Sequence, residues 1–391
     1  MFLFDIYKTS QQKFITGDQL SGERWITHLR TNPNYCAEST AAVDNFENLY
    51  FGSHSGNFYC LNSEGKIRWT FSTKKRIYGS PVLFEGSVIF TSGDGFLYCL
   101  DKQDGSIIWI KDLKKGYFDS RKLKIAQTFI HLPFTFSFRR RTNLDVKSWS
   151  SVSIIENSII ITGFGKGLYS FNYDGTEAWS YDLGFPRYQL SGVVCDDEKM
   201  IYCVARNCYI YKFDKLGKVV WKTRIIKGWH SWGNPSYNPN HKHLYCVFSK
   251  GENYGRLFAL SKNGKLIWQC NLKSTIRGSV AISNDGKSVY CADFKGYIYH
   301  IDALTGDIKI TRKISNAIRA LWTTPTVDLD NNIYISTKDS IDTGRVIKLD
   351  RNLKIIWEYK TNKTLCTPLI MSNKDVCFGS WDGNYYRIKT E

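Results

Sequence analysis

Hydrophobic and polar residues alternate along the chain in short runs, which is the pattern of half-buried β-strands. Residues 80 to 109, SPVLFEGSVIFTSGDGFLYCLDKQDGSIIW, contain four such runs. The turn signals between them are Gly86, "SGDG" and "KQDG", which supply Gly or Asp where the chain must reverse. This stretch therefore predicts four consecutive antiparallel strands joined by tight turns.

The four-strand pattern repeats along the whole chain. The last run of each unit carries a Trp with Gly or Leu four residues before it, at Trp69, Trp109, Trp179, Trp221, Trp268 and Trp357; Ile310 takes the same position once, and Trp25 opens the series. Successive spacings are 44, 40, 70, 42, 47, 42 and 47 residues. A period of 40 to 50 residues with four strands per unit is typical of a propeller blade.

The repeat also predicts how the ring closes. Seven units are complete between Trp25 and Trp357, and an eighth begins at Cys366 and ends after three strands. The run around Trp25 can supply the missing fourth strand, which leaves no open sheet edge. We predict an all-β fold: one domain, residues 1–391, forming an eight-bladed β-propeller of four-stranded antiparallel blades, the last closed by the N-terminal strand. Aromatic residues make up 15% of the chain, which favours strands.

The repeat resembles the PQQ enzyme repeat family. The segments "SVIFTSGDGFLYCLDKQDGSIIW" and "SVYCADFKGYIYHIDALTGDIKI" follow its pattern of paired aromatics, a Gly turn, "LY-x-L-D" and a Gly before Trp, and the resemblance extends over about residues 22 to 388. It implies the propeller fold, with the tryptophans as wedges between blades. It does not imply one function, because the family includes both redox enzymes and interaction proteins.

The chain departs from the chemistry that the resemblance brings with it. Quinoproteins of this family are exported, clamp the quinone with a disulfide between adjacent cysteines and bind calcium, yet none of the 11 cysteines here are adjacent. Scaffold propellers of the outer-membrane assembly machinery carry a lipidated cysteine near their start, but the first cysteine is Cys36, without a lipobox. We therefore predict no cofactor and no metal, and keep a PQQ-dependent dehydrogenase as a remote alternative.

One face of the propeller collects polar and aromatic residues. In a four-stranded blade, the connection to the next blade emerges beside the turn between the second and third strands, so residues three and five positions before each Ser-Pro-like entry should line a central funnel. The predicted ligand-binding residues are Arg76, Tyr78, Trp149, Arg187, His230, Trp232, Arg277, Trp322 and Lys363. Cations beside aromatic rings suit an acidic ligand. The alternative is that the tryptophans fill space between loops and the cations are solvated.

The sequence contains no phosphate-binding loop, zinc-protease motif or nucleophile elbow, so it does not indicate an enzyme. A non-redox enzyme with its active site in the funnel is the alternative function. Glu38 and His230 are then the candidates for general acid or base work.

Positive charge is partly concentrated in an insertion. The net charge is +17, and residues 111–149, between the second and third blades on the funnel face, hold ten Lys or Arg against three Asp. Its segment "FTFSF" alternates like a strand, and Arg139, Arg140 and Arg141 follow. We interpret it as a flap whose three arginines bind a partner. Contact with an anionic membrane or with nucleic acid is the alternative, although no sequence-reading motif is present.

The location prediction rests on two absences and on the cysteines. The N-terminus lacks a cleavage site of small residues, and no apolar run approaches the roughly 20 residues that a spanning helix needs. The cysteines lie in strand-like runs and are interpreted as buried, reduced thiols. We therefore expect a cytoplasmic binding or scaffold protein whose funnel face and basic flap hold an acidic small molecule, peptide or protein segment. The sequence gives no oligomeric state.

Overall fold

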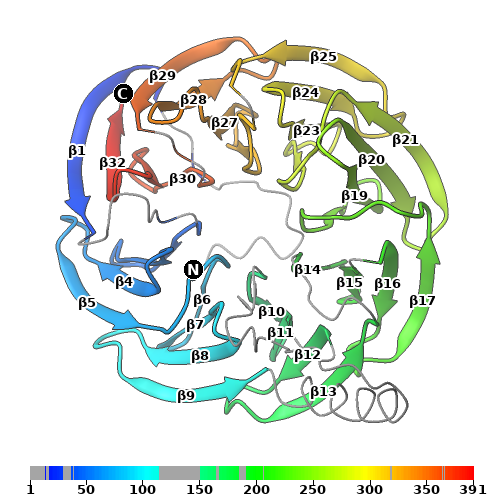
Figure 1. Ribbon diagram of the computed structural model, residues 1–391, viewed down its shortest axis with the longest axis horizontal. Helices are drawn as coiled ribbons and strands as arrows, with labels where there is room; N and C mark the ends of the chain where they lie inside the picture. Colours follow the sequence, from blue (N-terminus) through cyan, green and yellow to red (C-terminus); the bar gives the residue numbers. More distant parts are fainter. Residues whose placement is uncertain are drawn as a thin grey trace, which may run out of the picture.

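The computed structural model describes residues 14, 17–29, 37, 39–113, 150–163, 167–184, 191–205, 207–317, 319–362, 364 and 366–391. In these ranges the chain forms eight four-stranded antiparallel sheets arranged as a ring (Figure 1). The prediction of an all-β, eight-bladed propeller is confirmed.

The blades follow one another along the chain, and the first strand of each is the innermost. Blade 1 contains β2 (Ala42–Val43), β3 (Leu49–Gly52), β4 (Asn57–Leu61) and β5 (Ile67–Ser72), and blade 2 contains β6 (Val82–Phe84), β7 (Ser87–Thr91), β8 (Phe96–Asp101) and β9 (Ile107–Asp112). Blade 3 contains β10 (Ser153–Ile155), β11 (Ser158–Thr162), β12 (Gly167–Phe171) and β13 (Glu177–Asp182), and blade 4 contains β14 (Val193–Cys195), β15 (Ile201–Val204), β16 (Tyr209–Phe213) and β17 (Val219–Arg224). Blade 5 contains β18 (Ser236–Asn238), β19 (His243–Lys250), β20 (Tyr254–Ser261) and β21 (Leu266–Leu272), and blade 6 contains β22 (Ala281–Ile282), β23 (Ser288–Ala292), β24 (Tyr297–Asp302) and β25 (Ile308–Lys313). Blade 7 contains β26 (Thr326–Val327), β27 (Ile333–Ser336), β28 (Gly344–Leu349) and β29 (Ile355–Thr361), and blade 8 contains, from the inside outward, β30 (Leu369–Ile370), β31 (Val376–Gly379), β32 (Asn384–Thr390) and β1 (Leu20–His28).

The hydrophobic core lies between neighbouring blades. The second and third strands are buried on both faces, so they read as continuous apolar runs, whereas the outer strands alternate between exposed and half-buried residues. Between blades 1 and 2, for example, the rings of Phe58 and Phe90 stack with centroids 4.1 Å apart. Each blade therefore depends on its neighbours for burial.

The repeat tryptophans are wedges between blades, as predicted. Six indoles donate an Nε1 hydrogen bond to a carbonyl in the next blade's hairpin turn; Trp69, for example, reaches the Lys102 carbonyl oxygen at 3.2 Å. Gly105 in that turn lies directly under the indole, and a Cβ atom there would stand 2.6 Å from the Trp69 ring. Gly105 also has φ = +76°, which an L side chain rarely adopts. The Gly four residues before each Trp thus makes room for the preceding blade's wedge.

One joint uses a different pair of residues. Ile310 replaces the wedge tryptophan of blade 6, and Leu353, with φ = +63°, replaces the turn glycine of blade 7. Leu353 is fully buried, and Ile310 packs against the same core cluster. The larger turn residue compensates for the smaller wedge.

Blade 8 is built from both ends of the chain. β1 pairs antiparallel with β32, with Trp25 opposite Arg387 (Figure 1, blue beside red). Gln19 and Glu391 exchange both backbone hydrogen bonds at 2.9 Å. The Gly17 carbonyl oxygen accepts the Trp357 indole N–H at 3.3 Å. The segment before β1 thus takes the place of the hairpin turn that blade 8 lacks, and the predicted N-terminal closure is confirmed.

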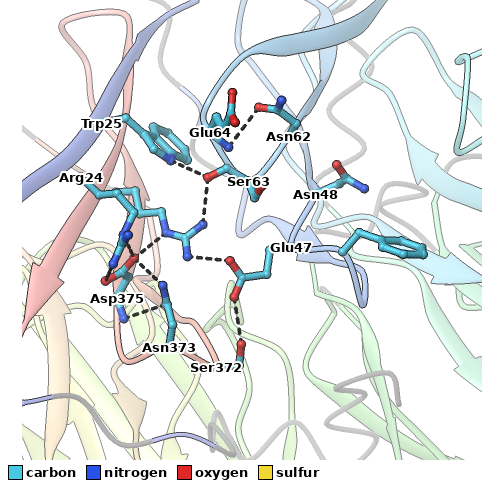
Figure 2. Close-up of polar contacts among 12 residues, drawn as sticks. Arg24, Trp25, Glu47, Asn48, Asn62, Ser63, Glu64, Ser372, Asn373 and Asp375 are labelled. Atoms are coloured by element: carbon cyan, nitrogen blue, oxygen red, sulfur yellow. Dashed lines mark hydrogen bonds and ion pairs between the residues drawn. The ribbon is translucent and has the colours of Figure 1, made fainter.

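A buried ion network joins blade 8 to blade 1 (Figure 2). The Arg387 guanidinium is 1% exposed; its Nε donates to Asp375 Oδ2 at 2.6 Å and its Nη2 to Glu47 Oε2 at 2.7 Å. Arg24 Nε donates to the same Asp375 oxygen at 2.5 Å, and Arg387 Nη1 reaches the Ser63 carbonyl oxygen at 3.2 Å. Two arginines therefore share one buried carboxylate across the strands that close the ring.

Candidate functional site on the funnel face

The connections between blades and the turns between second and third strands lie on one face, which we call the funnel face. Each connection runs between two such turns and is held by backbone bonds. In the connection to blade 2, the Ile77 N–H donates to the Ser53 carbonyl oxygen at 3.0 Å, and the Arg76 carbonyl oxygen accepts from the Gly93 N–H at 2.8 Å. The side chains of the connections and of these turns therefore have fixed positions relative to one another.

Consecutive connections of blades 5, 6 and 7 pack backbone against backbone. A Cβ atom on Gly233 would stand 2.4 Å from the Gly278 carbonyl oxygen, and one on Gly278 would stand 2.4 Å from the Thr323 carbonyl oxygen. The Asn234 N–H donates to Ser279 Oγ at 2.8 Å, and the same contact recurs one blade further on. These glycines bring equivalent residues of three blades into contact.

The residues immediately before these positions, Trp232, Arg277 and Trp322, form a cluster with Phe294 that we call the Arg277 stack. The Arg277 guanidinium carbon lies 4.1 Å from the Trp232 ring centroid and 4.4 Å from that of Trp322. Phe294, from the β23–β24 turn, is 5.2 Å from the guanidinium carbon and stacks with Trp322. A cation between two indole faces is held by attraction to both ring systems. The stack is half-buried and positions a fixed positive charge on this face.

A second cluster occupies the same face at blades 8, 1 and 2. The His54 ring centroid lies 4.7 Å from that of Tyr78 and 5.9 Å from that of Trp381. Arg76 is exposed, and its Nη1 lies 3.5 Å from the Tyr78 hydroxyl. Of the predicted ligand-binding residues, the structure thus unites Trp232, Arg277 and Trp322 in one group and Arg76 with Tyr78 in another.

Three site residues were missed by the sequence analysis: His54, Phe294 and Trp381. Each lies two residues before the glycine of a turn between second and third strands. Extending the repeat register to those turns would have found them, because they share the funnel face with the connections.

His230 contacts the stack from one side. Its ring centroid lies 5.4 Å from that of Trp232 in an edge-on arrangement, and its backbone pairs with Ser249 as an isolated bridge. The other catalytic candidate, Glu38, lies outside the described residues. So do Trp149, Arg187, Lys363, the partner-binding arginines Arg139, Arg140 and Arg141, and residues 114–149 of the insertion. These remain predictions.

Two acidic groups on the funnel face, Asp293 and Asp94, stabilise the turns that contain them. Asp293 is buried, and burial raises its pKa, although the Tyr299 hydroxyl (2.6 Å) and the backbone N–H groups of Lys295 and Tyr297 donate to the ionised form. Asp94 accepts equivalently from the Tyr98 hydroxyl at 2.8 Å. Over the part of the chain that the structure describes, no group of three or more His, Cys, Asp or Glu is arranged to hold a metal ion. The described side chains of the Arg277 stack are cationic and aromatic.

A separate pocket of about 320 Å³ lies at the junction of blades 1 and 2 on the opposite face, where first and second strands turn. Its wall includes Asp44, Tyr50 and Arg68. Asp44 accepts from the Tyr50 hydroxyl at 3.0 Å and from two backbone N–H groups, so its carboxylate is already engaged in the turn. The pocket does not include any residue of the Arg277 stack.

The fold and the repeat define a class, the PQQ-like β-propellers. The family model described as "Outer membrane protein assembly factor BamB" matches residues 15–127 and 141–359. The chain therefore belongs to this BamB-type family of PQQ-like propellers, and membership is consistent with a scaffold or binding role.

Relatives and solved structures agree with this assignment. The outer membrane protein assembly factor BamB of Shewanella oneidensis is 21% identical over 339 residues, which are 82% of this chain and 75% of that protein. The beta-alanine-activating enzyme of Mus musculus is 31% identical over 81 residues, but the match spans only 19% of this chain and 7% of the enzyme.

Two solved structures share the fold. The crystal structure of BamB from Moraxella catarrhalis superposes with a TM-score of 0.68 at 15% identity, covering 94% of this chain and 97% of that one. A europium-containing methanol dehydrogenase superposes with a TM-score of 0.69 at 12% identity, covering 95% of this chain and 88% of that one. At these identities the likeness concerns the fold alone.

The comparisons contradict the predicted cytoplasmic location. The matching family and the relative that covers most of the chain are outer membrane protein assembly factors. The prediction relied in part on the cysteines, which were interpreted as buried, reduced thiols, and nine of the ten described cysteines are indeed buried. Burial raises the pKa of Cys60 and Cys99 to about 11, so the reactive thiolate is scarce and the unpaired state says little about the redox compartment.

Among the residues that the structure describes, no helix has the length and apolar character needed to cross a bilayer.

Proposed function

We propose that this chain is a binding propeller whose funnel face holds an acidic segment of a protein partner. The observation that carries the proposal is the Arg277 stack, a guanidinium fixed between two indoles on a face formed by several blades. A preorganised cation loses little conformational entropy on binding and can donate charge-assisted hydrogen bonds to a carboxylate.

The comparisons support a protein as the partner. The relative that covers most of the chain is an assembly factor for outer membrane proteins, and assembly requires contact between proteins. The net charge of +17 favours an acidic segment over a basic one. The stack adds aromatic surface, which is enriched at the energetic centres of protein interfaces.

The test is the binding of a fluorescein-labelled deca-glutamate peptide, followed by fluorescence anisotropy at low and at physiological salt. Arg277→Met removes the charge and keeps an apolar side chain between the rings, so we expect binding at least about tenfold weaker. Arg68→Met removes one charge from an exposed position outside the stack and is the matched control. Equal affinity of the wild type and Arg277→Met would refute the proposal.

A further inference from the structure

Blade 5 carries an extended hairpin that reaches onto the connection of blade 6. Strands β19 and β20 have eight residues each, whereas β7 and β8 of blade 2 have five and six. The tip of this hairpin, residues 251–253, is exposed and is bound by the connection of blade 6. Thr275 Oγ1 donates to the Gly251 carbonyl oxygen and Ser274 Oγ donates to the Glu252 carbonyl oxygen, both at 2.7 Å. The tip therefore rests on the segment that carries Arg277 two residues later.

The tip places a carboxylate against a cation of blade 7. Arg319 Nε donates to Glu252 Oε1 at 2.9 Å, and its Nη2 donates to the same oxygen. Arg319 has φ = +56°, and the next residue, Ala320, donates its N–H to the Phe294 carbonyl oxygen of the stack. The side chains of Arg319 and Glu252 are 46% and 54% exposed, so solvent and competing anions reach the pair. An exposed pair of this kind is weak and readily exchanged.

Unsatisfied polar groups lie three and four residues beyond Arg319. Trp322 Nε1 and Thr323 Oγ1 are buried atoms for which the described part of the molecule offers no hydrogen-bond partner. Thr323 is 5% exposed as a residue. A buried donor without an acceptor is costly; these atoms have almost no exposed surface, so a ligand oxygen would remove that cost only after the segment that carries them shifts.

We propose that Glu252 is an internal competitor: in the free protein its carboxylate occupies the position on Arg319 that a carboxylate of the bound partner takes. The inference rests on the proposed function and makes it specific, because it assigns a carboxylate as the recognised group and the β19–β20 tip as the element that yields. Binding exchanges one exposed ion pair for another. Glu252 therefore reduces affinity for weakly acidic segments and selects those with enough carboxylates to displace it.

The experiment measures deca-glutamate affinity by anisotropy for the wild type, Glu252→Gln, Arg319→Gln and Trp322→Phe. We expect Glu252→Gln to bind about two- to fivefold more tightly, because the competitor is gone, and Arg319→Gln to bind more weakly by a similar factor. Trp322→Phe keeps the ring and loses the N–H, so it should also bind more weakly. Glu198→Gln is the matched control: Glu198 is 52% exposed, close to the 54% of Glu252, and pairs with Lys262 at 2.5 Å on the opposite face.

The outcomes separate this inference from the proposed function. If Arg277→Met abolishes binding while Glu252→Gln and Glu198→Gln leave it equally unchanged, the binding face stands and the internal competitor is wrong. If neither the wild type nor any variant binds the peptide, the proposed function and the internal competitor are both wrong. If millimolar free glutamate displaces the peptide from Glu252→Gln, the carboxylate site is supported but the partner is a small molecule and not a protein segment.

Discussion

Blades 2 and 8 each accept the wedge tryptophan of the preceding blade, but the accepting segments are connected differently along the chain. Blade 2 is one continuous stretch, and its hairpin turn supplies both the carbonyl of Lys102 and the space above Gly105 that receive Trp69. Blade 8 lacks that hairpin, so the segment before β1 supplies the Gly17 carbonyl oxygen for Trp357. The comparison shows that the joint depends on where a carbonyl is placed, and not on chain continuity.

Blade 8 adds something that blade 2 does not need. No hairpin turn links β1 to β32, so only noncovalent contacts hold β1 in the sheet of blade 8. The network of Arg24, Arg387 and Asp375 crosses the boundary between these two strands. Four predictions test how far the two kinds of joint are equivalent, from the largest expected effect to the smallest.

Deletion of residues 1–28 should abolish the cooperative fold. It removes β1, opens the edge of β32, and leaves the Trp357 indole without its acceptor. Size-exclusion chromatography and thermal unfolding followed by circular dichroism measure the loss. A synthetic peptide of residues 14–29 should restore the wild-type elution volume; a truncated chain that melts like the wild type would mean that β1 is dispensable.

Arg387→Met should lower the free energy of unfolding by about 3–5 kcal/mol, because Asp375 and Glu47 lose a fully buried cation. Urea unfolding measures the change. Lys66→Met is the control, since Lys66 pairs with Glu64 in an exposed, solvent-screened bridge that should contribute little to stability. Equal effects of the two substitutions would show that the network contributes no more than a surface pair.

Leu353→Gly should cost about 2–4 kcal/mol, because it leaves a cavity beside Ile310 at the joint without a tryptophan. Ile310→Trp alone should also destabilise, through overpacking against Leu353. The double substitution recreates the pair found at the other joints and should recover about 1–3 kcal/mol of the summed losses. Additive losses in urea unfolding would contradict the compensation.

Asp302→Asn should have the smallest effect, roughly 2 kcal/mol at pH 7. Asp302 lies in the blade 6 hairpin turn; partial burial raises its pKa, but Lys309 and two backbone N–H groups outweigh this and lower the pKa to about 2. A lowered pKa stabilises the fold above the unfolded-state pKa of 3.8, and the contribution disappears as pH falls through about 2. The difference in unfolding free energy between variant and wild type should therefore narrow between pH 4 and pH 2.

The control for this substitution is Asp104→Asn in the corresponding turn of blade 2, where the carboxylate is exposed and accepts from the Ser106 N–H. It should change stability less than Asp302→Asn does. A difference that stays constant with pH would show that the ionised carboxylate is not the cause.

The repeat register predicted the fold because each blade carries its own short-range sequence signals. Trp and Gly recur four residues apart in the outer hairpins, and even the Ile310 and Leu353 exception kept its place in the column. The register also placed Trp232, Arg277 and Trp322 on one face. Their direct contact could not be predicted, because it depends on how closely Gly233 and Gly278 let the backbones approach.

The contact between Glu252 and Arg319 was harder to predict from the sequence. It joins blade 5 to blade 7 across the intervening blade, and its partner Arg319 adopts a left-handed conformation that no local residue type demands. The location prediction was wrong for a different reason. It rested on two absences and on the cysteines, and cysteine burial follows from packing and carries no information about the compartment.

The closure of blade 8 also sets the timing of folding during synthesis. Arg24 and Asp375, which meet in the closing sheet, are separated by 351 positions. At about 5–20 residues per second the ribosome needs roughly 20–70 s to add that length, and throughout that time β1 has no partner strand within its own chain. Of the described strands, β1 thus emerges first and is paired last, and its edge stays unsatisfied until β32 has been made.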